Sequence, residues 1–110
     1  MFTIPKNTGS NQSRVKTDYG TLYFTQFDDG RFEYYGLLEL PAKVSFANIN
    51  YPIKIIDAVG VATNFYATTN TAIASMTCSW ERARVDVAMP SGEALTSMTR
   101  VNIMIKGKWK

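Results

Sequence analysis

Few side chains in this sequence are suited to catalysis. The chain has one cysteine, Cys78, and no histidine. Without histidine, a Ser–His–Asp or Cys–His triad cannot form, and the commonest zinc ligand is missing. Composition alone still permits a Ser–Lys or carboxylate-pair mechanism, but the acidic residues are scattered, mostly at turns or on polar faces. The sequence therefore predicts a protein that is not an enzyme.

Asp28 and Asp29 are adjacent carboxylates, and Gly30 follows them. They would act as a glycosidase-like pair only if a partner chain completed the site. Aspartate and glycine are also the usual residues of a tight turn, and we interpret them in this way. Cys78 lies between Met76 and Trp80 in an apolar pattern, which indicates a small buried side chain. No phosphate-binding glycine loop or EF-hand spacing is present, so we expect no cofactor and no metal.

Residues 62–80 are dense in Asn, Thr and Ser and contain no charged side chain. Neutral amides and hydroxyls together with flat rings suit a sugar, which has an apolar face and a rim of hydroxyls. The alternative is a Thr-rich sheet surface, because Thr favours strands. Trp80 also fits a buried position in phase with Met76 and Cys78. The predicted glycan-binding residues are Asn64, Tyr66, Asn70 and Trp80.

These residues would be carried by strands, because apolar side chains alternate through most of the chain. A hairpin is predicted from strands at about 21–27 and 31–40 around the Asp28–Gly30 turn. In the second strand Phe32, Tyr34, Leu38 and Leu40 share one face and are expected to be buried. The last segment predicts a strand with Val101, Ile103, Ile105 and Trp109 on the buried face and Lys106, Lys108 and Lys110 on the other.

The middle of the chain predicts shorter elements. We expect a short strand at 43–49 with Val44 and Phe46 on one face, a strand at 51–56, a turn from Asp57 to Gly60 and a strand at 61–69. Apolar residues change phase between Cys78 and Ala83, so a bulge or turn is expected near Glu81–Arg82. No helix is convincing. The fold class is all-β: a small antiparallel β-sandwich or barrel-like knob of about seven or eight strands.

The length of 110 residues fits one domain, and 45% apolar residues allow one modest core. We expect a flexible polar arm or connector at 1–18 and a β-rich head at 19–110. The small core, with Tyr35 and Leu37 on the face opposite Phe32, suggests an oligomer. No apolar run is long enough to span a bilayer, so membrane insertion is not expected. The net charge of +3 comes from the segment beginning at Arg100, so nucleic-acid binding is disfavoured.

Together the segments TLYFTQFDDGRFEYYGLLEL, INYPIKII and IKGKW, with the Ser/Thr/Asn/Ala-rich stretch between the last two, form a recognisable layout. The chain resembles the C-terminal head, or receptor-binding, domain of a bacteriophage tail fibre. The resemblance covers residues 18–110, although no shaft repeat is present. It implies a homotrimer at the virion tail tip, joined to an upstream fibre or baseplate protein. It also implies binding to host cell-surface polysaccharide and carries over no catalytic residue.

Three functions follow from these observations. The leading hypothesis is a receptor-binding tip that adheres to a bacterial surface glycan without cleaving it. The second is a small β-barrel that binds single-stranded nucleic acid, supported by aromatic strands and the basic C-terminus. The third is a purely structural virion trimerisation knob. Salt separates the first two, because phosphate binding weakens steeply with salt and neutral sugar binding does not.

Overall fold

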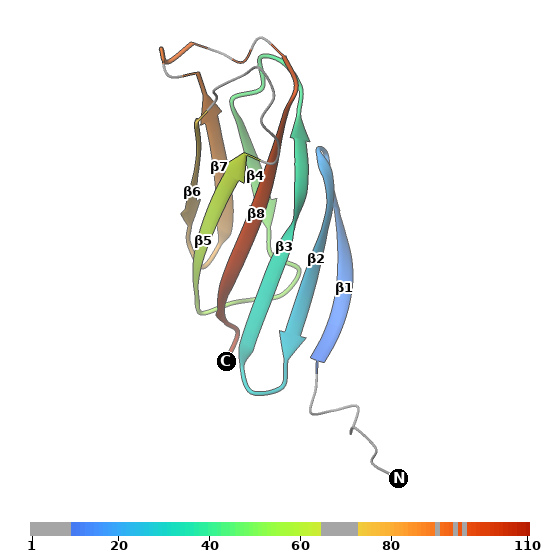
Figure 1. Ribbon diagram of the computed structural model, residues 1–110. Coiled ribbons are helices and arrows are strands. Elements are labelled where there is room, and N and C mark those ends of the chain that lie inside the picture. The colour runs from blue at the N-terminus through green and yellow to red at the C-terminus, as the bar shows by residue number, and fades with distance from the viewer. Residues whose placement is uncertain (1–9, 65–72, 90, 94, 96) are drawn as a thin grey trace.

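The molecule consists of two antiparallel β-sheets packed face to face (Figure 1). The structure, a computed structural model, describes residues 10–64, 73–89, 91–93, 95 and 97–110, and no helix occurs among them. The strands are β1 (Ser10–Thr17), β2 (Gly20–Phe27), β3 (Arg31–Leu40), β4 (Phe46–Asn50), β5 (Asp57–Asn64), β6 (Ile73–Cys78), β7 (Arg82–Ala88) and β8 (Thr99–Lys108). Eight strands in a sandwich confirm the predicted fold class.

Sheet A has five strands in the order β1-β2-β3-β8-β5, and sheet B has three in the order β4-β7-β6. The last strand of the chain, β8, lies between β3 and β5 and pairs with both along most of its length. The fold therefore depends on contacts between residues far apart in the sequence. β1 and β4 are edge strands on one side of the sandwich, and β5 and β6 are edge strands that contact each other on the other side.

The core lies between the sheets and follows the predicted alternation in the first hairpin and the last strand. Phe32, Tyr34, Leu38 and Leu40 on β3 are buried, as are Val101, Ile103 and Ile105 on β8. Phe24 stacks on Phe32 with ring centroids 5.3 Å apart and meets Tyr34 edge-on at 5.3 Å. The Tyr34 hydroxyl donates a hydrogen bond of 3.0 Å to the backbone carbonyl of Asn50, which ties the two sheets together.

The two predicted turns flanked by strong strand patterns are confirmed. The β2–β3 turn at Asp28–Gly30 has Gly30 at φ 100°, a conformation that favours glycine. The apolar pattern changes phase after Cys78 because a turn follows, in which the Ser79 amide donates a hydrogen bond of 3.0 Å to the Arg82 carbonyl. Trp109, expected on the buried face of the last strand, is half-buried, and its indole N–H donates to the Phe27 carbonyl at 2.8 Å.

β4 begins later than the strand predicted at 43–49, and Val44 and Phe46 do not form one face of it. Ala47 and Ile49 point inward, and Phe46 is 41% exposed. The backbone turns at Pro41–Val44, where Lys43 has φ 70°, so Val44 precedes the strand and does not set its phase. The register against β7, which pairs Ala47 with Val85 and Ile49 with Ala83, decides the inward face.

The prediction of a turn at Asp57–Gly60 was wrong, because these residues form the first half of β5. Gly60 allows β5 and β6 to approach each other closely. A Cβ at this position would collide with the Met76 sulfur and would lie 2.8 Å from the Cys78 sulfur. Residues 51–56, predicted as a strand, form no strand, although Ile55 is buried and Tyr51 and Ile53 are half-buried. Only the first part of the strand predicted at 61–69 lies within the described residues, and it belongs to β5.

The expected polar arm also differs from the structure at Ser10–Thr17. This segment is β1, and all of it pairs with β2. Its polar side chains fit an edge strand: Gln12 donates from Nε2 to the hydroxyls of Thr25 at 3.2 Å and Tyr35 at 3.1 Å. Val15, on the opposite face, packs against the core. The paired head therefore extends to Ser10.

Candidate functional site

The sandwich has two distinct ends. The hairpin end holds the β2–β3 turn. The C-terminal residues lie at the same end, because the Trp109 amide donates a hydrogen bond of 2.8 Å to the Gly30 carbonyl. Ser10 pairs with Phe27, so β1 also begins at this end. The loop end holds the β1–β2 turn at Asp18–Tyr19, the β3–β4 connection at 41–45 and the last residue of β5, Asn64 (Figure 1).

The predicted glycan residues fall into separate regions. Asn64 ends β5, where its backbone pairs with Val101. Tyr66 and Asn70 lie outside the described residues. Trp80 is 63% exposed in the β6–β7 turn, so it is not a core residue.

Asn64 and Trp80 lie toward opposite ends of the sandwich. Gly60 on β5 lies against Cys78 on β6. Asn64 lies four residues beyond Gly60 toward the loop end, and Trp80 lies two residues beyond Cys78 toward the hairpin end. At about 3.3 Å per strand residue, the separation is about 20 Å. One small sugar therefore does not contact both in the same chain.

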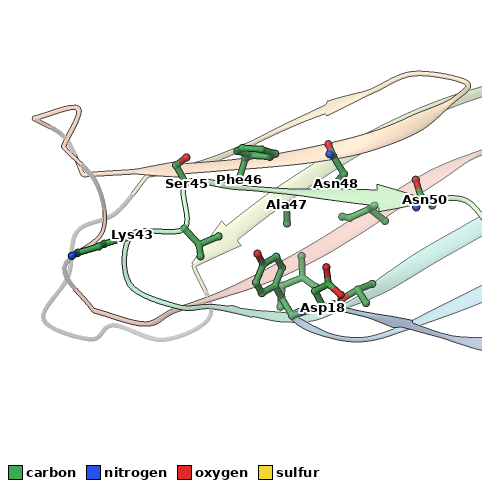
Figure 2. A pocket seen from close by; sticks show the side chains of 12 residues that line it. Asp18, Lys43, Ser45, Phe46, Ala47, Asn48 and Asn50 are labelled. Carbon is green, nitrogen blue, oxygen red and sulfur yellow. Dashed lines mark hydrogen bonds between the residues drawn. The ribbon is translucent and has the colours of Figure 1, made fainter.

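A crevice of about 480 Å³ follows β4 along the side of the sandwich where β1 and β4 are edge strands (Figure 2). Its apolar floor includes Leu38, Val44 and Ile49, and Asp18 and Tyr19 form the wall opposite β4. Figure 2 shows Ala47 pointing from β4 toward the Asp18 turn, whereas Asn48 and Asn50 point to the other side of the strand. The crevice combines an apolar floor with polar groups along its edges.

The outer face of sheet B begins at this crevice and is also rich in polar side chains. Across the three strands, Asn48 pairs with Arg84, and Arg84 pairs with Thr77. The Arg84 guanidinium lies 4.1 Å from the centre of the Phe46 ring and donates to Asp86 at 3.0 Å. One amide, one hydroxyl, one fixed guanidinium and one exposed ring thus share a surface, a combination that can bind sugar hydroxyls and a sugar's apolar face.

Sequence reasoning missed β4 as a site element, although a signal was present. Asn48 and Asn50 alternate with Ala47 and Ile49, which predicts polar-outward and apolar-inward faces. Grouping Val44 and Phe46 on one face hid this pattern. Trp80 is near the same surface, because it lies two residues before Arg82, and Arg82 pairs with Asn50.

The groups considered for catalysis have structural roles in the turn and the core. Asp29 accepts hydrogen bonds from the Arg31 amide at 3.1 Å and from its guanidinium at 2.7 Å. These bonds, the one from the amide first, lower the pKa of Asp29. Burial raises the pKa of the half-buried Cys78 thiol, which disfavours the reactive thiolate. Within the part of the chain that the structure describes, no cluster of His, Cys, Asp or Glu could hold a metal ion, and no helix is long and apolar enough to cross a membrane.

Two basic residues on β8 have acidic neighbours. Lys106 lies 3.7 Å from Glu33, and Arg100 lies 3.3 Å from Glu39. Both acids are on the adjacent strand β3. A continuous basic groove for a phosphate backbone is therefore not formed along these strands, and nucleic-acid binding gains no support.

No protein-family model and no curated protein sequence matches this chain. Three solved structures share its fold. The N-truncated R2-type pyocin tail fiber matches 91% of this chain with a TM-score of 0.58 and 16% sequence identity. The R1 pyocin fiber of P. aeruginosa matches 90% at a TM-score of 0.52 and 12% identity, and the R2 pyocin fiber of P. aeruginosa matches 91% at 0.50 and 13%.

The likeness covers nearly all of this chain but only part of each fiber. The matched regions are 39%, 28% and 26% of the three fiber chains. At such low identity the comparison establishes a shared fold, which is that of a β-rich region in a phage-tail-like fiber. It transfers no ligand and no site residue.

Proposed function

We propose that this chain is a receptor-binding domain at the tip of a phage or phage-like tail fibre, and that it adheres to a bacterial surface glycan without cleaving it. The observation that carries the proposal is the fold shared with three pyocin fibers over at least 90% of the chain. In this proposal the domain is a homotrimer joined to an upstream fibre or baseplate protein, and it is located on the virion.

Recognition of a neutral glycan is supported by the side chains on and beside β4. Asn48 and Asn50 offer amides, and the exposed rings of Phe46 and Trp80 offer apolar surface on the same sheet or at its end. A polysaccharide lying across sheet B can contact Asn48, Asn50 and Trp80 together. Asn64, Tyr66 and Asn70 belong in this proposal to a second contact at or beyond the end of β5.

The affinity of one such site is expected to be low. Neutral hydrogen bonds and ring stacking give a Kd of about 1 mM, which corresponds to about 4 kcal/mol. Three linked copies gain avidity of about 10²–10⁴ without any new contact. Weak single sites are therefore compatible with firm adhesion by an assembled tip.

Adsorption to host cells tests the glycan site. Purified protein carrying Trp80→Ala, Asn48→Ala, Tyr66→Ala or Asn70→Ala is compared with the parent, with circular dichroism and melting as controls for folding. Lys54→Ala is the control, because Lys54 is exposed in the β4–β5 connection and belongs to neither proposed contact. We expect at least one of the four variants to lose about tenfold or more in adsorption and Lys54→Ala to lose nothing.

Two further measurements can refute the proposal. Adsorption that falls steeply between low and high salt would indicate phosphate or charge recognition instead of a neutral sugar. If all four variants fold and adsorb like the parent, the glycan contact lies elsewhere, and the β2–β3 hairpin around Asp28 is the next surface to test.

A further inference from the structure

The outer face of sheet A, opposite the core, carries an apolar band that nothing in the described chain covers. Val59 is 74% exposed, Val61 61% and Met104 37%. They lie on β5 and β8, and Met104 pairs with Tyr35 on one side and Val61 on the other. Tyr35 continues the row to Tyr23, with ring centroids 5.7 Å apart.

The band is broad and shallow. A hollow of about 460 Å³ lies over Tyr35, Leu37, Val61 and Met104, and a second of about 310 Å³ lies over Val59, Val61 and Met104. Aromatic residues and methionine in the centre with charged residues around them are typical of protein interfaces. Contiguous exposed apolar surface of this kind marks contact with another macromolecule.

Charged residues at the two ends of the band, along the strand direction, indicate a particular partner. On one side Glu33 pairs with Lys106, and on the other Glu39 pairs with Arg100. The acids are both on β3 and the bases both on β8. At these two heights β3 carries acids and β8 carries bases, with apolar residues between them; beyond the band β3 also carries Arg31, which is paired with Asp29.

A second copy of the chain complements this pattern in one orientation. A rotation axis parallel to the strands keeps every residue at its height and brings the β3 side of one copy against the β8–β5 side of the next. Glu33 then meets Lys106 of the next copy, and Glu39 meets Arg100 of the next copy. A twofold axis across the strands in the plane of the sheet would instead set Glu33 against Glu39, a like-charge contact that costs free energy.

We propose that the outer face of sheet A is the surface through which copies of this chain associate, about a rotation axis that runs parallel to the strands. The number of copies rests on the fibre tip proposed above, but the face and the axis direction rest on the band and its charges.

Matched substitutions on the two outer faces test the proposal. Val61→Asp places a charge in the band, and Ile73→Asp places the same charge on sheet B at a residue of similar exposure, 61% against 59%. Sedimentation velocity of the parent is expected to show an assembly larger than one 12.3 kDa chain. We expect Val61→Asp to sediment as a single chain and Ile73→Asp to match the parent. A parent that is monomeric at all concentrations, or a folded Val61→Asp variant that still assembles, would overturn the proposal.

Charge variants decide the question if Val61→Asp does not fold. One variant carries Glu33→Lys and Glu39→Arg, and the second carries these two changes together with Lys106→Glu and Arg100→Glu; all four residues lie on the outer face of sheet A. The first variant sets like charges against each other and is expected to be monomeric, whereas the second restores opposite charges in every contact, whatever the number of copies, and is expected to associate. A folded first variant that still assembles, or a folded second variant that stays monomeric, would refute the interface. Cell adsorption is measured separately, so an assembled parent that does not adsorb contradicts only the proposed function.

Discussion

The facing of β4 gives the sharpest test of the structure, because Ile49 and Phe46 lie on opposite faces of this strand. Ile49 is 0% exposed and pairs with Ala83, whereas Phe46 is 41% exposed. Ile49→Ala removes three buried carbons, about 0.8 kcal/mol each in transfer free energy, and leaves a cavity besides. We expect a loss of about 3–4 kcal/mol in the free energy of unfolding.

Phe46→Ala should cost much less, although phenylalanine is the larger side chain. Its main specific contact is the Arg84 guanidinium at 4.1 Å. A cation–π contact at an exposed site is worth about 0.5–1 kcal/mol, and partial burial adds a similar amount. We therefore expect a loss of about 1–1.5 kcal/mol.

Urea denaturation followed by tryptophan fluorescence measures both losses, at one fixed protein concentration because association adds to apparent stability. For a domain with about 5–15 kcal/mol in total, the Ile49→Ala loss is large enough to resolve easily. A greater cost for Phe46→Ala than for Ile49→Ala would show that Phe46 faces the core and that the β4–β7 register is wrong.

Three further predictions follow from named contacts. Truncating Val101, Ile103 or Ile105 to Ala should cost about 2–4 kcal/mol in urea denaturation and truncating Lys106 or Lys108 less than about 0.5, so equal costs in the two sets would contradict the orientation of β8. Burial raises the pKa of Tyr34 to about 12 from 10.0, so the folded state keeps a proton that the unfolded chain loses, and stability should fall as pH rises from 10.0 toward about 12. Melting over this alkaline range should show a smaller decline for Tyr34→Phe than for the parent, and an identical decline would mean that Tyr34 is not the titrating group. Finally, incubation with host polysaccharide should release no reducing ends, and a release that Asp28→Asn or Asp29→Asn abolished would establish a hydrolase.

The first hairpin and the last strand were predictable from sequence because several local signals agree there. Asp28–Gly30 supplies turn residues, and Phe32 and Tyr34 alternate with polar neighbours. In β8 every second residue from Val101 to Ile105 is apolar and buried. Where turn chemistry and alternation agree, one local segment determines both the element and its inward face.

The middle of the chain was not predictable in the same way, because contacts between distant segments decide it. Gly60 appeared to mark a turn, but its missing side chain makes room for Met76 and Cys78 from β6. β1 looked like a polar arm because edge strands tolerate polar residues on both faces, and only its pairing with β2 shows that it belongs to the sheet.

For the candidate site, the types of residue were easier to predict than their positions. Neutral polar and aromatic side chains do gather on one surface, but Asn48 and Asn50 on β4 carry much of it. Trp80 was predicted in the site because of its residue type, although its phase with Cys78 also fitted a buried position in the core. The turn at Ser79–Arg82 decides between the two, because it releases Trp80 from the alternation and leaves it exposed.

In the proposed fibre tip, assembly and glycan binding use different surfaces of the fold. β1 begins at the hairpin end, where Ser10 pairs with Phe27. The apolar band on sheet A faces away from the core, and the polar surface of sheet B faces the other way, because the two sheets pack through their inner faces. Copies that associate through sheet A therefore leave every sheet B directed outward. In the proposed assembly the glycan surface of every copy thus stays uncovered, and avidity requires that several copies can bind together.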